Sequence, residues 1–409
     1  MPAFLTHWRV LIETAQRSQD AGSDLGSLII DATALRRRLT GFPTPPQTTP
    51  AGAVWDTGPL PEIDFRFPGS DISAMAYLGA LAPDIPSYQR GYFAGKISGR
   101  DQHHETRQDN DQPIQWARLL HTNRSGDFLL SFLEQIANIP SPASRSQALA
   151  FAMGYLSHIA TDIALHPCIN TLASIYTSQA ASGIFAPLTP HSYVELCLDE
   201  YIAATYFERA LYSWGNRPWV YYIEPAASHL TTPTTLTAQT LDLFISAAEA
   251  TYGLSEQQSE TLRREYRAGI HRLRLYLAGR GSFRWLLLNA QLRKRDHDLI
   301  RMTIAAQQRQ AGIVTFEEAI TYAVRLSERL CRRAISYYAS LRNTEATANE
   351  RNQRRAALLK DLRNWDLNTG YTLEVLFDQQ VTLRFLHNWL YFEELWNSEA
   401  EQAQHTFAT

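Results

Sequence analysis

A series of histidine and acidic residues in the first half of the chain has the composition and spacing of a metal site. Its strongest part is His158, Asp162 and His166, in which each residue follows the previous one by four positions. A helix turns once in about 3.6 residues, so such residues lie on one face. His191 and Glu195 form a second pair with the same spacing. A face of alternating imidazole and carboxylate is poorly explained by packing, and it indicates a centre with more than one metal ion.

Three further residues could complete this centre. His7 lies on an amphipathic segment, Asp84 lies in a proline-rich turn, and His121 precedes a loop. Taken alone, each of them, and even a single His-x3-Glu pair, is as well explained by a structural role. Neutral imidazole nitrogens and carboxylate oxygens are zinc ligands. The candidate ligands are therefore, in chain order, His7, Asp84, His121, His158, Asp162, His166, His191 and Glu195.

The composition is that of a globular protein with a large core. The chain has 409 residues, of which 45% are hydrophobic and 19% charged, and its net charge of -3 indicates no particular partner. Cys168, Cys197 and Cys331 form no CxxC pair, so we expect core residues and no disulfide framework. No run supplies the ~18 apolar residues of a membrane span. The N-terminus lacks the features of a signal peptide, so we expect a cytoplasmic protein, a location compatible with signal-independent export.

Helical periodicity runs through most of the chain and predicts an all-α, multi-helix bundle. Helices are expected at about 3–17, 73–82, 112–123, 127–139, 144–166, 189–212, 236–252, 255–278, 283–310, 315–342 and 344–363. Pro167 is expected to end the helix at 144–166. A short strand is expected at 371–377, whereas 380–397 fits either a helix or a strand. We divide the chain into a zinc-binding helical core at 1–230 and a mainly helical C-terminal region at 231–409 that packs on the core or extends it.

The order of the candidate ligands resembles that of the zinc-dependent phospholipase C family, which includes bacterial phosphatidylcholine-type enzymes and the catalytic domain of clostridial alpha-toxin. Members are all-α and carry three zinc ions, with ligands in the order Trp, His, Asp, His, His, Asp, His, His, Glu. The chain matches all of these but the first. Residues 78–85 and 154–158 look like signature segments of the family, and the resemblance extends over roughly residues 1–212.

The resemblance implies how the zinc ions are held. His121, His158 and Asp162 would hold the first ion, and His166, His191 and Glu195 the second, with Asp162 bridging the two. His7 and Asp84 would hold the third ion.

The chain departs from the family in three places. The N-terminal Trp ligand is missing, since Met1 begins the chain and Trp8 follows His7; we therefore expect two zinc ions, with the third depending on His7 and Asp84. Asp162 and His166 are closer in sequence than in the secreted enzymes. The C-terminal region has no counterpart in the family.

The resemblance implies phosphodiester hydrolysis of glycerophospholipids, which gives diacylglycerol and a phosphorylated head group, with Asp84 also orienting the attacking water. The partner would be a phospholipid or other phosphoester, reached by peripheral contact with a membrane. Nucleic acid is not favoured, and the oligomeric state stays open. The basic run at 263–301 could face an anionic membrane or nucleic acid, although a solvated helix face is the commonest outcome.

Two alternatives stay open. One is a zinc nuclease or phosphomonoesterase built on the same metal cluster. The other is a non-hydrolytic biosynthetic or binding protein that keeps the metal site.

Overall fold

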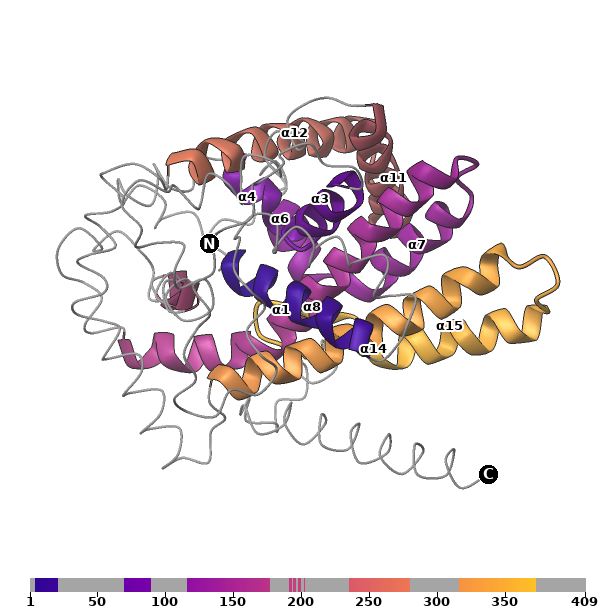
Figure 1. Cartoon of the computed structure of the whole chain (residues 1–409). Helices are drawn as coiled ribbons and strands as arrows, with labels where there is room; N and C mark the ends of the chain where they lie inside the picture. The colour runs from indigo at the N-terminus through magenta and orange to yellow at the C-terminus, as the bar shows by residue number, and fades with distance from the viewer. Residues whose placement is uncertain are drawn as a thin grey trace, which may run out of the picture.

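The computed structural model describes residues 4–20, 70–89, 116–176, 235–279 and 316–372, together with residues 191, 192, 194, 195, 198, 199 and 202. These residues are helical apart from short connections and one two-stranded hairpin (Figure 1), which confirms the all-α class. The expected helix at 283–310 and the segment 380–397 lie outside the described residues.

The described helices are as follows, in chain order. They are α1 (Phe4–Asp20), α3 (Ser70–Gly79), the 3-10 turn η1 (Ala82–Asp84), α4 (Ile85–Gln89), α6 (Trp116–Thr122), α7 (Ser125–Ala137), α8 (Pro142–Tyr176), α11 (Thr235–Tyr252), α12 (Glu256–Gly279), α14 (Phe316–Arg342) and α15 (Ala348–Leu362). The hairpin strands are β1 (Trp365–Asp366) and β2 (Tyr371–Thr372), which pair antiparallel.

The central element is α8, a helix of 35 residues. It contacts α1, α3, α7, α11 and α14, so neighbours cover it on several sides (Figure 1). Contrary to the sequence expectation, an 18-residue window within Ser144–Asn170 is apolar enough to cross a membrane. That window is 100% buried inside the molecule, which identifies α8 as the core helix of the bundle.

The expected end of this helix at residue 166 is wrong, because Pro167 lies inside α8. A proline lacks the N–H that would donate to the carbonyl four residues earlier, here that of Ile163. The hairpin turn packs at this position: a Cβ atom on Gly370 would lie 2.7 Å from the Ile163 oxygen and 2.8 Å from Pro167 Cδ. The helix continues beyond the proline with Leu172 and Ala173 buried in the core, so tertiary packing outweighs the local preference.

Helices α3 and α8 approach each other so closely that their backbones touch. A Cβ atom on Gly79 would lie 2.0 Å from the Phe151 carbonyl oxygen, and one on Gly154 would lie 2.0 Å from that of Ala76. Glycine is required at both positions, since no side chain fits between the two backbones. This contact places the end of α3, and the turn that follows it, directly against α8.

The C-terminal helices pack onto the same core. Helix α14 contacts α8 and α1, and α15 contacts α14. Arg9 of α1 makes a two-pronged ion pair with Glu317 of α14, at 2.9 and 2.6 Å. One hydrophobic cluster includes Phe4, Leu156 and Leu367. The C-terminal region thus contacts the ligand-bearing helices directly, while a domain boundary at residue 230 stays a prediction.

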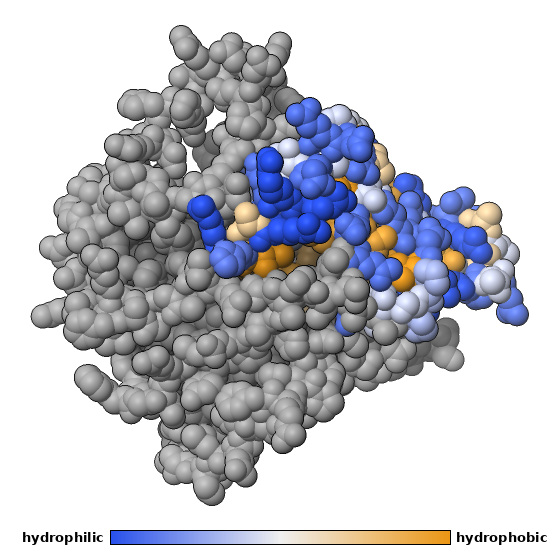
Figure 2. Space-filling view, turned by 90° about the horizontal axis from the view of Figure 1, so that it is seen from above, coloured by the Kyte–Doolittle hydropathy of each residue, from blue (hydrophilic) through white to orange (hydrophobic). Residues whose placement is uncertain are grey.

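Helix α12 carries the described part of the basic run. Leu262, Tyr266 and Leu273 are buried on its inner side, and hydrophilic side chains cover its outer side when the molecule is seen from above (Figure 2). Arg263 pairs with Asp242 at 3.1 Å and with Glu260 at 2.7 Å. This segment has the pattern of a solvated amphipathic helix; residues 280–301 lie outside the described part.

We predict that Gly154→Ala lowers the free energy of unfolding by about 3 kcal/mol, because the added methyl group forces α3 and α8 apart. Urea denaturation measures the change. The matched control is Gly253→Ala, since Gly253 has a φ of +67° and nothing within 4 Å of a Cβ atom; backbone strain should cost it about 1 kcal/mol. Equal losses in the two variants would contradict the close-contact explanation.

Candidate metal centre

The structure gathers the eight candidate ligands into three groups. Within each group, one potential ligand atom of each residue lies within 4.8 Å of the others. The first group is His121, His158 and Asp162; the second is His166, His191 and Glu195; and the third is His7, Asp84 and His158. All of these residues are buried except His191, whose side chain is 33% exposed.

Five parts of the chain supply these side chains. Helix α8 carries His158, Asp162 and His166 on one face, as the spacing predicts. His7 comes from α1, and Asp84 from η1, which α3 places beside α8.

His121 comes from α6, and His191 and Glu195 belong to a helical stretch within the described residues between 191 and 202.

The first group has the dimensions of a single tetrahedral zinc site. His121 Nε2 lies 3.2 Å from Asp84 Oδ1, 3.6 Å from Asp162 Oδ2 and 3.3 Å from His158 Nε2. His158 Nε2 lies 3.0 Å from Asp162 Oδ2. Ligands at the usual zinc distances of about 2.0–2.1 Å from a tetrahedral ion are roughly 3.3 Å apart. Asp84 thus lies next to His121, and it also shares a group with His7, as the resemblance implied.

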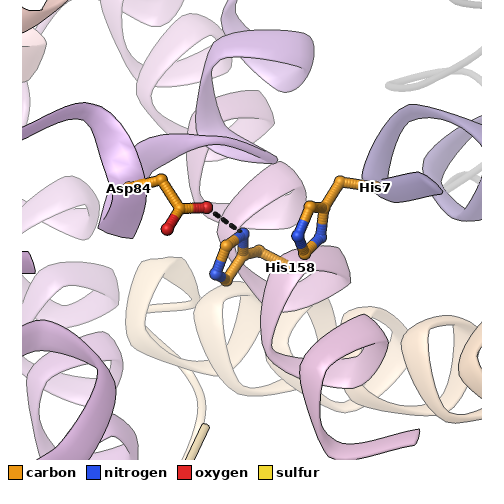
Figure 3. Close-up of side chains that lie close together, drawn as sticks. All are labelled: His7, Asp84 and His158. Atoms are coloured by element: carbon orange, nitrogen blue, oxygen red, sulfur yellow. Dashed lines mark ion pairs between the residues drawn. The ribbon is translucent and has the colours of Figure 1, made fainter. Parts of the chain in front are cut away.

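His7 lies against the other oxygen of Asp162. Its Nε2 is 3.5 Å from Asp162 Oδ1, and its ring stacks on that of His158 with centroids 4.1 Å apart (Figure 3). His158 Nδ1 is 3.8 Å from Asp84 Oδ2, but it donates to the Ala80 carbonyl at 2.9 Å and so cannot also bind a metal. Asp162 thus lies close to His7 as well as to His121 and His158, while its bridging of the first and second ions stays a prediction.

The second group consists of three potential ligands. Glu195 Oε1 lies 3.1 Å from His191 Nε2 and 3.5 Å from His166 Nε2. Zinc bound by three protein ligands keeps a fourth position for water or substrate, which is the arrangement of catalytic sites. The partial exposure of His191 places solvent next to this group.

An outer shell of oxygen atoms orients four of the five histidines. In each case the ring Nδ1 donates to an oxygen, while Nε2 faces the candidate metal position. The pairs are His121 with Ala117 O at 2.6 Å, His158 with Ala80 O at 2.9 Å, His166 with Leu367 O, and His191 with Asn170 Oδ1 at 2.8 Å. A backbone carbonyl only accepts hydrogen bonds, so these partners hold the proton on Nδ1 and leave the Nε2 lone pair for a metal.

The charges of the centre call for a cation. Burial lowers the pKa of His166, but Asp162 and Glu195 outweigh this effect and raise the pKa to about 9. Burial raises the pKa of Glu195, but interactions with positively charged neighbours, the N-terminal amino group first and then His191 and His166, hold that pKa well below its usual range. Buried carboxylates are stable only beside positive charge, which protonated imidazoles supply in the absence of a metal and which a bound cation would supply in their place. Zinc satisfies this requirement as well as the geometry.

Three buried atoms of the candidate ligands have no hydrogen-bond partner among the described residues: Asp84 Oδ2, Asp162 Oδ2 and His7 Nδ1. Burial, reinforced by His158, lowers the pKa of His7 to about 3, so its ring is neutral and suited to bind a metal. Trp8 does not replace the missing N-terminal Trp ligand. Its indole N–H donates to the Tyr77 carbonyl at 3.3 Å, and the residue is 3% exposed in the core.

Two residues that support the centre escaped the sequence analysis. Asp199 is 2% exposed and accepts hydrogen bonds from the backbone N–H groups of Leu5 and Thr6 at the start of α1, at 3.4 and 3.1 Å. A carboxylate is stabilising at a helix N-terminus, and here it helps to hold the helix that carries His7. Asn170 accepts the proton of His191. Asp199 follows Glu195 by four residues, and Asn170 follows His166 by four residues. This spacing was the signal in the sequence that could have identified both residues.

Two of the cysteines, Cys168 and Cys331, are buried and form no disulfide. Neither belongs to the three groups of potential ligands found among the described residues. Cys197 lies outside the described residues.

The comparisons with known proteins gave one match. No curated protein and no solved structure matches the chain significantly. Residues 60–253 match the model of a family described as zinc dependent phospholipase C. The matched region contains every candidate ligand except His7, and it ends before α12. Over residues 60–253, the chain is therefore similar to the zinc-dependent phospholipase C family.

Proposed function

We propose that the protein is a zinc-dependent hydrolase that cleaves the head-group phosphodiester of glycerophospholipids, releasing diacylglycerol and a phosphorylated head group. The family indicates a hydrolase of phospholipase C type; the substrate and the reaction products are our proposal. The observation that carries it is the set of three groups of potential metal ligands, each of which includes a residue of α8 and one of which includes the partly exposed His191.

The donor set fits zinc. It consists of imidazole nitrogens and carboxylate oxygens, and the spacings within the first group match a tetrahedral ion. Hydrogen bonds to oxygen atoms hold four of the five rings in an orientation that suits zinc binding. We assign His121, His158 and Asp162 to the first ion, and His166, His191 and Glu195 to the second. His7 and Asp84 would hold a third ion.

Bound zinc ions would stabilise the negative charge that develops on phosphate oxygens and would acidify a water molecule. The chain's part is to hold these ions rigidly on α8 and to keep one side open beside His191. We assign Asp84 the additional role of orienting the attacking water. One of its oxygens faces His121, while the other is buried and has no hydrogen-bond partner among the described residues, so that oxygen is available to accept a proton.

We predict that protein purified without chelators or an affinity tag contains two or three zinc ions per chain. Asp162→Asn should lose at least one of them and should lower the rate of hydrolysis by at least about 100-fold, because the neutral amide binds zinc poorly and leaves the imidazoles without their counter-charge. Elemental analysis measures the metal. The control is Asp242→Asn, which alters a carboxylate paired with Arg263 on the surface. If zinc content and activity are unchanged in Asp162→Asn, the assignment is refuted.

We predict that the zinc-loaded protein converts phosphatidylcholine in vesicles to diacylglycerol and phosphocholine. Removal of zinc with a chelator should abolish the reaction, and added zinc should restore it, since the metal supplies the charge stabilisation. Mass spectrometry of the lipid and aqueous phases identifies the products.

The same preparation should be offered single-stranded DNA, RNA and a phosphomonoester. Cleavage of one of these without release of diacylglycerol would favour a nuclease or phosphomonoesterase. Stoichiometric zinc with no hydrolysis of any substrate would favour a non-hydrolytic role.

A further inference from the structure

The turn that joins β1 to β2, residues 366–370, lies against the ligand-bearing helices although it is far from them in sequence. The Leu367 N–H donates to the backbone carbonyl of His121 at 2.8 Å, and the Leu367 carbonyl accepts the Nδ1 proton of His166. The next carbonyl, that of Asn368, accepts a hydrogen bond from the Asn170 amide at 2.9 Å. The turn thus contacts residues of both main ligand groups, and it lies outside the region that matches the family.

Asn170 extends the influence of the turn to a third histidine. The Asn368 carbonyl only accepts, so the amide nitrogen of Asn170 must face it. The amide oxygen of Asn170 then faces His191 Nδ1, at 2.8 Å. That oxygen also only accepts, so the proton of His191 lies on Nδ1 and Nε2 is left for the metal position beside Glu195. One carbonyl of the turn therefore determines the tautomer of a histidine that it does not touch.

The turn itself is well defined. Asp366 Oδ1 accepts from the Asn368 N–H at 3.0 Å, and the Asp366 carbonyl accepts from the Gly370 N–H at 2.8 Å. Gly370 has a φ of +74°, which favours glycine. Trp365 and Leu367 are buried, 3% and 0% exposed, and anchor the turn in the core. Its carbonyls are thereby held in place before any metal binds.

We propose that the turn at 366–370 and Asn170 are positioning elements of the metal centre, which orient His166 and His191 and so set the zinc affinity of the second group. The inference rests on the proposed function, because it takes from that proposal that the second group binds zinc. Hydrogen bonds to the outer nitrogen of a zinc-bound histidine hold the ring and raise its basicity, and their loss typically costs about 10–100-fold in metal affinity.

The first test concerns the link through Asn170. Asn170→Ala removes both hydrogen bonds and should weaken zinc binding to the second group by about 10–100-fold, whereas Asn170→Asp keeps an acceptor for His191 and should remain within a few-fold of the parent. Competition with a chromophoric chelator measures the affinity for zinc alone. Asn352→Ala, an exposed position on α15, is the matched control. An affinity of Asn170→Ala equal to that of the control, or an equal loss in Asn170→Asp, would overturn the inference.

The second test concerns the turn. In Gly370→Ala the added methyl group would meet Ile163 O and Pro167 Cδ, and the turn must shift away from α8. Gly253→Ala places alanine at a similar φ of +67° with nothing within 4 Å, so it carries the backbone strain without the clash. We expect Gly370→Ala to lose zinc from the second group and Gly253→Ala to keep it. Equal zinc affinity in both variants would count against a role of the turn.

A third measurement separates a failure of this inference from a failure of the proposed function. In the metal-free protein, nuclear magnetic resonance should show that the Nδ1 proton of His191 exchanges slowly with solvent, and that in Asn170→Ala it exchanges fast. If the parent chain binds no zinc but still shows this difference in exchange rate, the proposed function is refuted, whereas the inferred orientation of the His191 ring stands. Fast exchange in the parent would refute the orientation itself.

Discussion

The need to neutralise buried carboxylates governs the arrangement of this protein. Asp84, Asp162 and Glu195 lie in the core with exposures of 6%, 3% and 4%, and imidazole rings surround them. Ionised groups in such surroundings are tolerated only when paired with positive charge. Carbonyl oxygens accept the Nδ1 proton of four rings, so Nε2 of each of these rings faces the carboxylates and the candidate metal positions. Positive charge on the imidazoles or on bound cations is therefore needed at the same positions.

The same helix serves as the core of the fold and as the support of the site. Helix α8 is buried over its whole apolar window, and its three ligands lie on one of its faces. The glycine contacts between α3 and α8 allow the two backbones to touch, and this brings both Asp84 and the Ala80 carbonyl beside His158. Packing and ligand geometry consequently depend on one another: a change that separates these helices also moves a ligand and its outer-shell oxygen.

The C-terminal part of the chain participates in the centre through its backbone. Helices α14 and α15 lead into the hairpin whose turn contacts His121 and His166. Asp361, which is 1% exposed, pairs with Arg329 and Arg333 at 2.5 and 2.6 Å and so ties the end of α15 to α14. Residues beyond the family match thus help to shape a site whose ligands, apart from His7, lie within that match.

The sequence alone was sufficient for most of the described helices and for the candidate ligands on α8, because the four-residue spacing of His158, Asp162 and His166 reflects local helix geometry. Only the tertiary structure placed Asp84 beside His121 and His7 beside Asp162, since these contacts join segments far apart in the chain. The tertiary structure also determined that α8 continues past Pro167, because packing outweighed the local tendency of proline to end a helix. The role of Leu367 had no signal in the sequence, because the group that acts is a backbone carbonyl, which every residue possesses.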